Sequence, residues 1–107
     1  MIFITDKKGK DLVLTSPEEF LLVKADGMYC FIYTVEMEKY KVKMPLRDIF
    51  ESLKEVFIRC HKGYLVNPKY IKLIDVMNSE IELKIDNVRI PISRRILQDI
   101  KRDALII

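Results

Sequence analysis

The sequence predicts a mostly β fold with one helix in the middle of the chain and a second helix at its C-terminal end. Short runs rich in Val, Ile, Phe and Tyr recur along the chain, and Gly, Pro, Asn and Asp separate them, which is typical of strands joined by turns. Apolar residues occur at helical spacing in two stretches, 46–56 and 96–100. The chain of 107 residues is long enough to bury one core, so we expect a single domain over 1–107.

The N-terminal segment is expected to begin with a hairpin. The runs FIT and LVL flank DKKGKD, which predicts a turn at Gly9. In SPEEF, which follows, Ser16 can cap a very short helix and Pro17 suits its first turn.

Three further strands are expected before the first long helix. The runs 20–25 and 29–35 flank a turn centred on Asp26-Gly27. The run 40–44 alternates apolar residues with lysines, which indicates a strand with one buried face. We expect it to form a hairpin with 29–35.

A helix is predicted from Pro45, which suits a first turn. Its apolar stripe comprises Leu46, Ile49, Phe50, Leu53 and Val56. More strands follow at 56–60, 64–66, 71–77, 80–85 and 88–92. Pro91 lacks an N–H group and marks an edge strand or a bulge. Asp86-Asn87 is a turn signal, and Ser93 is expected to cap the C-terminal helix.

Composition excludes several classes of protein. No apolar run approaches the roughly 20 residues of a membrane span, and the N-terminus lacks the layout of a signal peptide, so we expect a cytoplasmic protein. Two cysteines, Cys30 and Cys60, make no disulfide framework and are expected to be buried thiols. With one histidine and no CxxC or HxxxH spacing, we expect no metal site and no cofactor.

The net charge of +3 is small, but its distribution is uneven. Residues 1–38 contain four basic and seven acidic side chains, whereas 59–72 contain four basic side chains and no acid. The stretch 84–102 contains six basic and two acidic side chains. This asymmetry favours a basic face that binds a polyanion, although lysines that only keep the surface soluble would give a similar pattern.

The run FIRCHKGYLVNP (57–68) combines Cys, His and Lys. Consecutive strand side chains point to opposite faces, so Cys60 and His61 cannot act together as nucleophile and base, and the chain has no second histidine. Alternation places Ile58 and Cys60 inward and Arg59 and His61 outward. We therefore do not expect an enzyme, particularly since Gly-rich phosphate loops and paired carboxylates are also missing from the sequence.

A binding role fits this run better. His61 and Lys62 are expected at a loop tip, where their donors can reach phosphate oxygens or base edges. Gly63 is expected to let the backbone turn there. Asn67, before Pro68, is expected to be a structural turn former.

Two other loops carry candidate binding residues. Arg94 and Arg95 come directly after a strand, at the N-terminus of the last helix, where free N–H groups suit phosphate. A solvated first helical turn is the alternative explanation. The DGMY turn presents Met28 or Tyr29 at a strand start, although a place in the core is the better explanation for Tyr29.

Three motifs, VKADGMY, FIRCHKGYLVNPKYI and IPISRR, with an amphipathic helix between the first two, resemble the LytTR-type DNA-binding domain of bacterial response regulators. The resemblance covers about residues 10–103. It implies packed small antiparallel sheets with one mid-chain helix and a C-terminal helix. It also implies a transcriptional regulator whose loops enter successive major grooves of repeated half-sites in duplex DNA and bend the DNA.

The resemblance also implies roles for individual residues. It assigns base reading to Lys62, Arg94 and Tyr29, with Met28 standing where relatives have a hydrogen-bonding side chain. It assigns contacts with the DNA backbone to His61, Ser93, Arg95 and Lys69. The implied partners are double-stranded DNA with repeated half-sites and a second copy of the chain on DNA. If the chain belongs to a longer protein, a receiver domain or sensor kinase of a two-component system is a further partner.

Two other functions are compatible with the residues. A module that binds RNA or single strands would stack bases on exposed aromatic side chains. Tyr29, Phe31 and Tyr33 share one face by alternation, although we expect them to be core residues. A protein-interaction domain could use the apolar tail ALII at 104–107.

Overall fold

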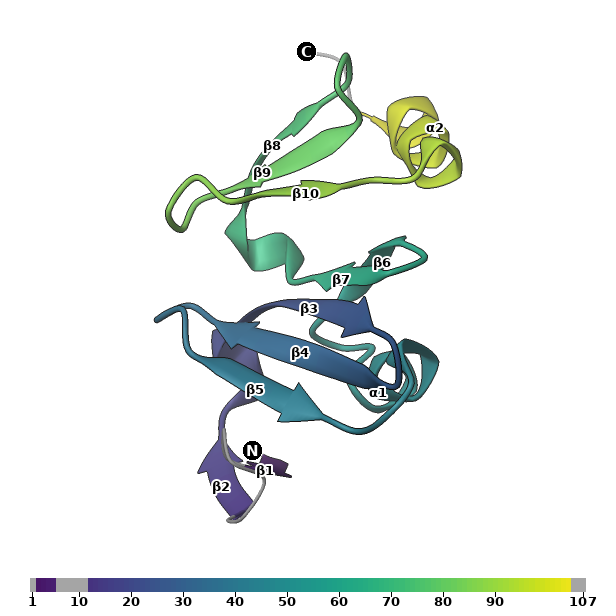
Figure 1. The fold of residues 1–107 in the computed structure, drawn as a ribbon. Helices are drawn as coiled ribbons and strands as arrows, with labels where there is room; N and C mark the ends of the chain where they lie inside the picture. Colours follow the sequence, from purple (N-terminus) through teal and green to yellow (C-terminus); the bar gives the residue numbers. More distant parts are fainter. Residues whose placement is uncertain (1, 6–11, 105–107) are drawn as a thin grey trace.

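The structure, a computed structural model, describes residues 2–5 and 12–104, and its largest unit is a five-stranded antiparallel sheet. The strand order is β5-β4-β3-β7-β6, with β3 in the centre (Figure 1). The strands are β3 (Phe20–Asp26), β4 (Tyr29–Thr34), β5 (Lys39–Val42), β6 (Ile58–His61) and β7 (Tyr64–Val66). The expected hairpin of 29–35 with 40–44 is confirmed, since Cys30 lies opposite Val42.

A smaller sheet has the strand order β10-β9-β8. It comprises β8 (Ile71–Asp75), β9 (Glu80–Leu83) and β10 (Arg89–Pro91), and α2 (Arg94–Asp103) follows. Pro91 lies on an edge strand, as its missing N–H group predicts. Asp86 and Asn87 form the predicted turn, both with a φ of 52°. A separate hairpin pairs β1 (Ile2–Thr5) with β2 (Leu12–Thr15), and the turn predicted at Gly9 lies outside the described residues.

The five-stranded sheet is buried by different partners on its two faces. One face packs against α1 (Leu46–Ser52), and the first core lies between them. The other face, over β3, β6 and β7, packs against the three-stranded sheet and α2, and the second core lies there. This arrangement confirms the prediction of a mostly β fold with a mid-chain helix and a C-terminal helix.

Strand β3 contributes to both cores, and its register with β4 shifts between Phe20 and Leu22. Phe20 and Val23 enter the first core, whereas the consecutive residues Leu21 and Leu22 enter the second. A simple alternating strand could not place two neighbouring side chains on one side. The irregularity therefore ties the two cores together through one strand.

Asn67 joins the start of β3 to the end of β7. Its side-chain amide donates to the Phe20 carbonyl at 2.9 Å and to the Glu18 carbonyl at 3.4 Å, and its Oδ1 accepts from the Lys69 N–H at 3.1 Å. Its backbone N–H donates to the Leu21 carbonyl at 3.0 Å. The side chain is buried, which confirms Asn67 as a structural residue that begins the short helical turn η2 (Pro68–Tyr70).

Several sequence-based expectations are corrected by the structure. The mid-chain helix ends at Ser52 instead of reaching 56, because Leu53 leaves the helical region with φ −129° and ψ 31°. Leu53 is nevertheless buried, and Val56 is half-buried against the first core. The last two apolar residues of the predicted stripe therefore still pack on the core, but from a turn that follows the helix. Ser16 precedes η1 (Pro17–Glu19), but its hydroxyl donates to the Glu18 carboxylate and does not cap a backbone N–H.

One expectation about the central motif is also wrong. Ile58 is exposed and not buried, although it lies opposite Val66 of the second core, because β6 is the edge strand of the five-stranded sheet. Gly63 lies in the turn between β6 and β7, as expected, although the positive φ among the described glycines belongs to Gly27. A Cβ at Gly63 would lie 3.8 Å from the His61 Nδ1 atom, which is an ordinary contact.

The smaller sheet carries an ion cluster around Arg89. Its guanidinium lies 2.8 Å from Asp75, 2.8 Å from Glu82 and 3.4 Å from Glu80. Hydrogen bonds from Arg89 and then from Asn78 lower the pKa of Asp75 to about 2. Arg89 therefore neutralises a local acidic group and does not contribute to a free basic face.

Helix length also bears on the membrane question. Within residues 2–5 and 12–104, no helix is long and apolar enough to cross a bilayer.

Replacing Asn67 with Ala should destabilise the fold by about 2–4 kcal/mol, since several buried hydrogen bonds are lost and their backbone partners stay buried. Urea denaturation measures this directly. The matched control is Asn78→Ala, whose side chain bonds Asp75 at an exposed turn and should cost less than about 1 kcal/mol. An equal cost for both variants would contradict the role assigned to Asn67.

Replacing Arg89 with Met should lower the urea midpoint of unfolding at neutral pH. It should also make that midpoint fall less steeply as the pH is lowered. The pKa of Asp75 is about 2 in the folded protein and about 3.9 when unfolded, so its stabilisation is complete above about pH 4 and lost as the pH falls toward 2. The difference between wild type and variant should therefore shrink over that interval. Arg102→Met, which removes an exposed pair with Asp99, is the control and should shift the midpoint little.

Candidate nucleic-acid interface

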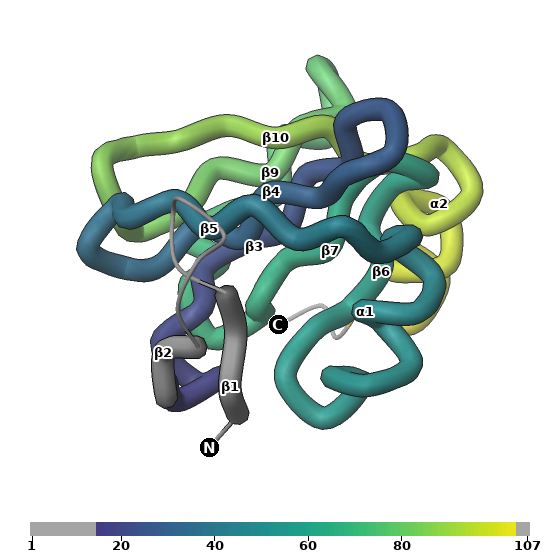
Figure 2. The backbone as a smooth tube through the Cα atoms, turned by 60° about the horizontal axis from the view of Figure 1, so that its bottom comes forward, coloured from purple at the N-terminus to yellow at the C-terminus, as the bar shows by residue number. Residues whose placement is uncertain are grey.

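Three loops that are distant in sequence lie next to one another along one side of the molecule. They are the β3–β4 turn (26–28), the β6–β7 tip (61–63) and the segment 93–95 that begins α2 (Figure 1). The Ala25 N–H donates to the Gly63 carbonyl at 2.9 Å, and the Ser93 N–H donates to the Cys60 carbonyl at 2.8 Å. These two backbone bonds fix both outer loops to the central tip, and Figure 2 shows the same grouping from a second direction.

The central tip is shaped by hydrogen bonds of its own. The Gly63 N–H donates to His61 Nδ1 at 3.1 Å, so in the neutral ring the proton is on Nε2, which is the nitrogen left to donate to a ligand. The His61 ring meets the Tyr64 ring edge-on, with centroids 5.8 Å apart. Arg59 donates to the Lys62 carbonyl at 2.9 Å. This hydrogen bond holds the backbone of Lys62 in place, and the Lys62 side chain is exposed.

The segment 93–95 presents two cations at a helix N-terminus. Ser93 caps α2 as predicted, accepting from the Ile96 N–H at 3.2 Å, and its hydroxyl proton stays available to a ligand. Arg94 and Arg95 are exposed in the first turn, which contains no acidic residue. Cations at this end of a helix oppose its dipole, whereas an anion placed there is stabilised. The arrangement therefore becomes favourable when an anion binds between the arginines and the helix.

The β3–β4 turn differs chemically from the other two loops. Gly27 adopts a φ of 61° in the turn that Asp26-Gly27 predicted, and Met28 is 71% exposed at the tip. Tyr29 is only half-exposed, and the Lys41 ammonium lies 4.1 Å from its ring centroid. Tyr29 is thus neither a core residue nor the residue that projects furthest; Met28 occupies the tip.

The exposed cations of the two basic loops form no ion pair with described carboxylates. Elsewhere, Lys72 pairs with Glu82, Arg89 pairs with three carboxylates and Arg102 pairs with Asp99. Among the described residues, no carboxylate forms an ion pair with Lys62, Arg94 or Arg95. Of the basic residues in 84–102, Arg89 and Arg102 are thus taken up by carboxylates, whereas the two arginines at the start of α2 form no described ion pair.

Lys69 is not brought to the three loops. It lies in η2, at the opposite end of β7 from the 61–63 tip (Figure 1), with its ammonium 5.6 Å from the Tyr70 ring centroid. Its contact with the DNA backbone stays a prediction.

Three residues in or beside the three loops were not singled out as site residues from the sequence. Arg59 was expected only to face outward, and its bond to the Lys62 carbonyl could not be foreseen without the register shift in β6. Lys24 is exposed on β3 opposite Tyr64, and Asp26 is an exposed acid in the first loop. Pairing of the third strand with the seventh is what places Lys24 here, and no local sequence signal gives that pairing.

The thiols have no reactive setting. Cys60 is fully buried, and burial raises its pKa to about 12. Cys30 is also buried, which raises the pKa of its thiol. In the described part of the chain, no group of three or more His, Cys, Asp or Glu side chains is placed to hold a metal ion.

Comparisons with known proteins agree with this geometry. The family model of the LytTr DNA-binding domain matches residues 10–104. One similar solved structure is the LytTr DNA-binding domain of a Bacillus cereus protein described as a methyl-accepting/DNA response regulator. The two chains are 26% identical, the match covers 94% of each chain and the TM-score is 0.71. No curated protein matches the chain.

The native thiols should react slowly with a chromogenic disulfide reagent at mildly alkaline pH, because only an accessible thiolate attacks it. Both should react at once in urea. Rapid modification of Cys60 in the native protein, located by mass spectrometry, would contradict the inert role that its burial assigns.

Proposed function

Because the chain belongs to the LytTr DNA-binding domain family, we propose that it is a sequence-specific binder of duplex DNA that regulates transcription. The observation that carries the proposal is the grouping of three loops along one side of the molecule. Two of these loops carry exposed cations that no described carboxylate pairs with. Loops of this kind can enter a groove of the duplex while the sheets behind them hold their spacing.

The proposed roles follow from what each side chain offers. Lys62 and Arg94 read base edges, and Arg is the commonest bidentate partner of guanine. His61, Ser93 and Arg95 donate to phosphate oxygens, through Nε2, the hydroxyl proton and the guanidinium respectively. This division assigns one base reader and at least one phosphate anchor to each of the two basic loops.

The first loop is proposed to contribute differently. Met28 at its tip has no hydrogen-bond donor, so it suits an apolar contact such as that with the thymine methyl group. Tyr29 is proposed to contact DNA from beside the tip, where Lys41 lies over its ring. This loop is thus proposed to form fewer hydrogen bonds with base edges than the other two loops.

The mode of assembly is also a proposal. We infer that two copies bind repeated half-sites, with loops in successive major grooves and bending of the duplex between them. We also infer that the chain acts with a receiver domain in a two-component system. The similar Bacillus cereus domain, which comes from a protein described as a response regulator, supports this inference.

Binding of single strands is disfavoured by a specific observation. Tyr29 and Phe31 are half-exposed and not buried as expected, yet Lys41 and Lys39 lie over their rings at 4.1 Å and 4.6 Å. Base stacking requires an open ring face. Protein interaction through the tail 104–107 remains a second candidate, and 105–107 lie outside the described residues.

Fluorescence anisotropy on a duplex selected from a random library tests the proposal, with salt titration and competition by single strands. We expect a steep fall of affinity with salt and a clear preference for duplex. Arg94→Ala should weaken cognate binding by about 1–3 kcal/mol and random-duplex binding much less. Arg95→Ala should weaken both equally and reduce the salt slope by about 1.

Arg47→Ala is the matched control. Arg47 is an exposed arginine on α1, which packs on the face of the five-stranded sheet opposite to α2. It should leave both affinities unchanged. No duplex binding at low salt, or equal losses for Arg94→Ala on cognate and random duplex, would contradict the assigned roles.

A further inference from the structure

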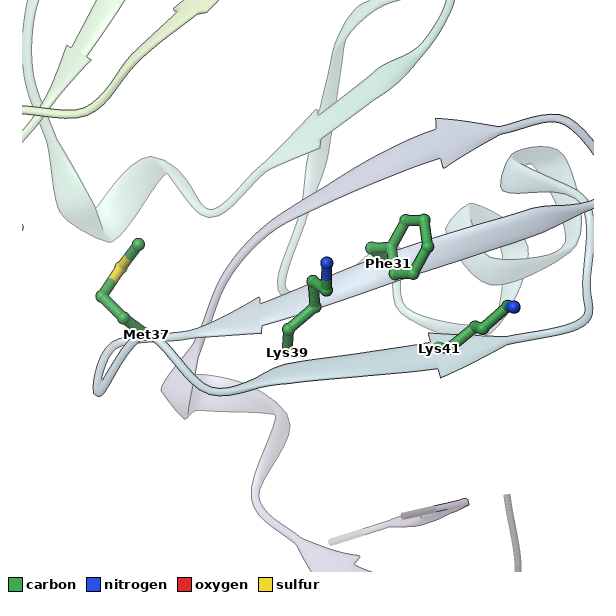
Figure 3. Close-up of a pocket in the computed structure, with 4 residues that line it drawn as sticks. All are labelled: Phe31, Met37, Lys39 and Lys41. Carbon is green, nitrogen blue, oxygen red and sulfur yellow. The ribbon is translucent and has the colours of Figure 1, made fainter. Parts of the chain in front are cut away.

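The face of β4 and β5 that points away from α1 carries a surface outside the three loops. The second sheet and α2 cover this side of β3, β6 and β7, but over β4 and β5 the lysines are exposed and Phe31 is half-exposed. We call the surface made by Phe31, Met37, Lys39 and Lys41 the β4–β5 face. Figure 3 shows these side chains on one side of the two strands, with α1 on the other.

The strand register arranges cations and rings in a pattern on this face. Phe31 lies opposite Lys41 on β5 and opposite Lys24 on β3, and directly opposite residues share a face of the sheet. The Lys39 ammonium lies 4.6 Å from the centroid of the Phe31 ring. A cation held over a ring is partly ordered already, so an anion that pairs with it immobilises less side-chain freedom.

The four side chains line an open hollow of about 420 Å³. Among the described residues, Phe31 and Met37 supply its apolar part and Lys39 and Lys41 its cationic part. Glu38, next to Met37 in the chain, accepts a hydrogen bond from the Tyr40 hydroxyl at 3.0 Å. The hollow therefore combines apolar surface with positive charge.

Met37 occupies a backbone position that normally favours Gly or Asn. Its φ is 64°, in the left-handed region, and its N–H donates to the Thr34 carbonyl at 2.9 Å to close the β4–β5 turn. A long apolar side chain that is 39% exposed at a strained position contributes little to the cores. A binding role explains why such a side chain stands there.

We propose that the β4–β5 face binds an acidic segment of a partner protein that carries an apolar side chain among its carboxylates. The apolar side chain enters the hollow against Phe31 and Met37, and a neighbouring carboxylate pairs with the Lys39 ammonium group at its rim. Methionine adapts its shape to an incoming side chain, which suits this position. Opposite charges across such a contact also raise the rate of association.

Nucleic acid fits this face less well than a protein segment. A phosphate backbone pairs with cations and uses no apolar hollow, and stacked bases need ring faces that the lysines already cover. The face reaches from Phe31 to Met37, in the turn at 35–38 (Figure 3), and the 26–28 turn lies at the other end of β4. On the function proposed above, a partner can therefore occupy it while the three loops hold DNA.

The test uses a fluorescein-labelled peptide in which Asp and Glu alternate with Leu and Phe, titrated with the whole chain. We expect binding that Lys39→Glu weakens by about tenfold or more through charge reversal. Met37→Asn keeps the left-handed backbone favourable and removes the apolar contact, so it should fold at least as well and also lose binding. A peptide with Ser in place of Leu and Phe should bind markedly less.

Lys84→Glu is the matched control, since it makes the same charge change at an exposed lysine after β9. It should leave peptide binding unchanged, and all three variants should keep their affinity for duplex DNA. The proposal is overturned if the peptide does not bind, or if Lys84→Glu weakens binding as much as Lys39→Glu. If duplex DNA displaces the peptide, the face belongs to DNA and the proposal is overturned. If the chain self-associates and Lys39→Glu abolishes this, the face belongs to a second copy of the chain and the proposal is likewise overturned. Loss of DNA binding in wild type would contradict only the function proposed above.

Discussion

The buried side chain of Asn67 is the constraint on which the arrangement of the two cores depends. It donates to carbonyls before and at the start of β3 and accepts from the first turn of η2, so it holds the end of β7 beside the start of β3. From there the chain passes into the three-stranded sheet that buries the second face. Because a buried amide must satisfy all its polar groups, this geometry permits little variation.

The position of the loops follows from this constraint. β7 pairs with β3, and its register places the Gly63 carbonyl against the Ala25 N–H. The second sheet then returns β10 toward β6, where the Ser93 N–H reaches the Cys60 carbonyl. The relative positions of Met28, Lys62 and Arg94 are thus set by backbone bonds between strands and not by the loops themselves. Such a scaffold can hold side chains at the spacing of a double helix without a recognition helix.

Electrostatics separates two uses of positive charge in this chain. Arg89 and Lys72 neutralise carboxylates on the smaller sheet and belong to its stability. Arg94 and Arg95 are cations at the positive end of the dipole of the helix that they begin. Their placement becomes favourable when an anion binds there. The lysines of β5 form a third group, ordered over aromatic rings beside an apolar hollow. One small domain can in this way offer one surface to DNA and another to an acidic protein.

Local patterns in the sequence determined the elements and several of their caps. Alternation gave the strands, Asp26-Gly27 and Asp86-Asn87 gave turns with positive φ, and Ser93 gave the start of α2, because each depends on a few neighbouring residues. The family motifs also pointed to the three loops. Tertiary structure alone decided the early end of α1, the exposure of Ile58, the bracing of Lys62 by Arg59 and the hollow beside Phe31. These features depend on register shifts and on pairing between strands far apart in the chain, and both are set by how the two cores pack and not by any local preference.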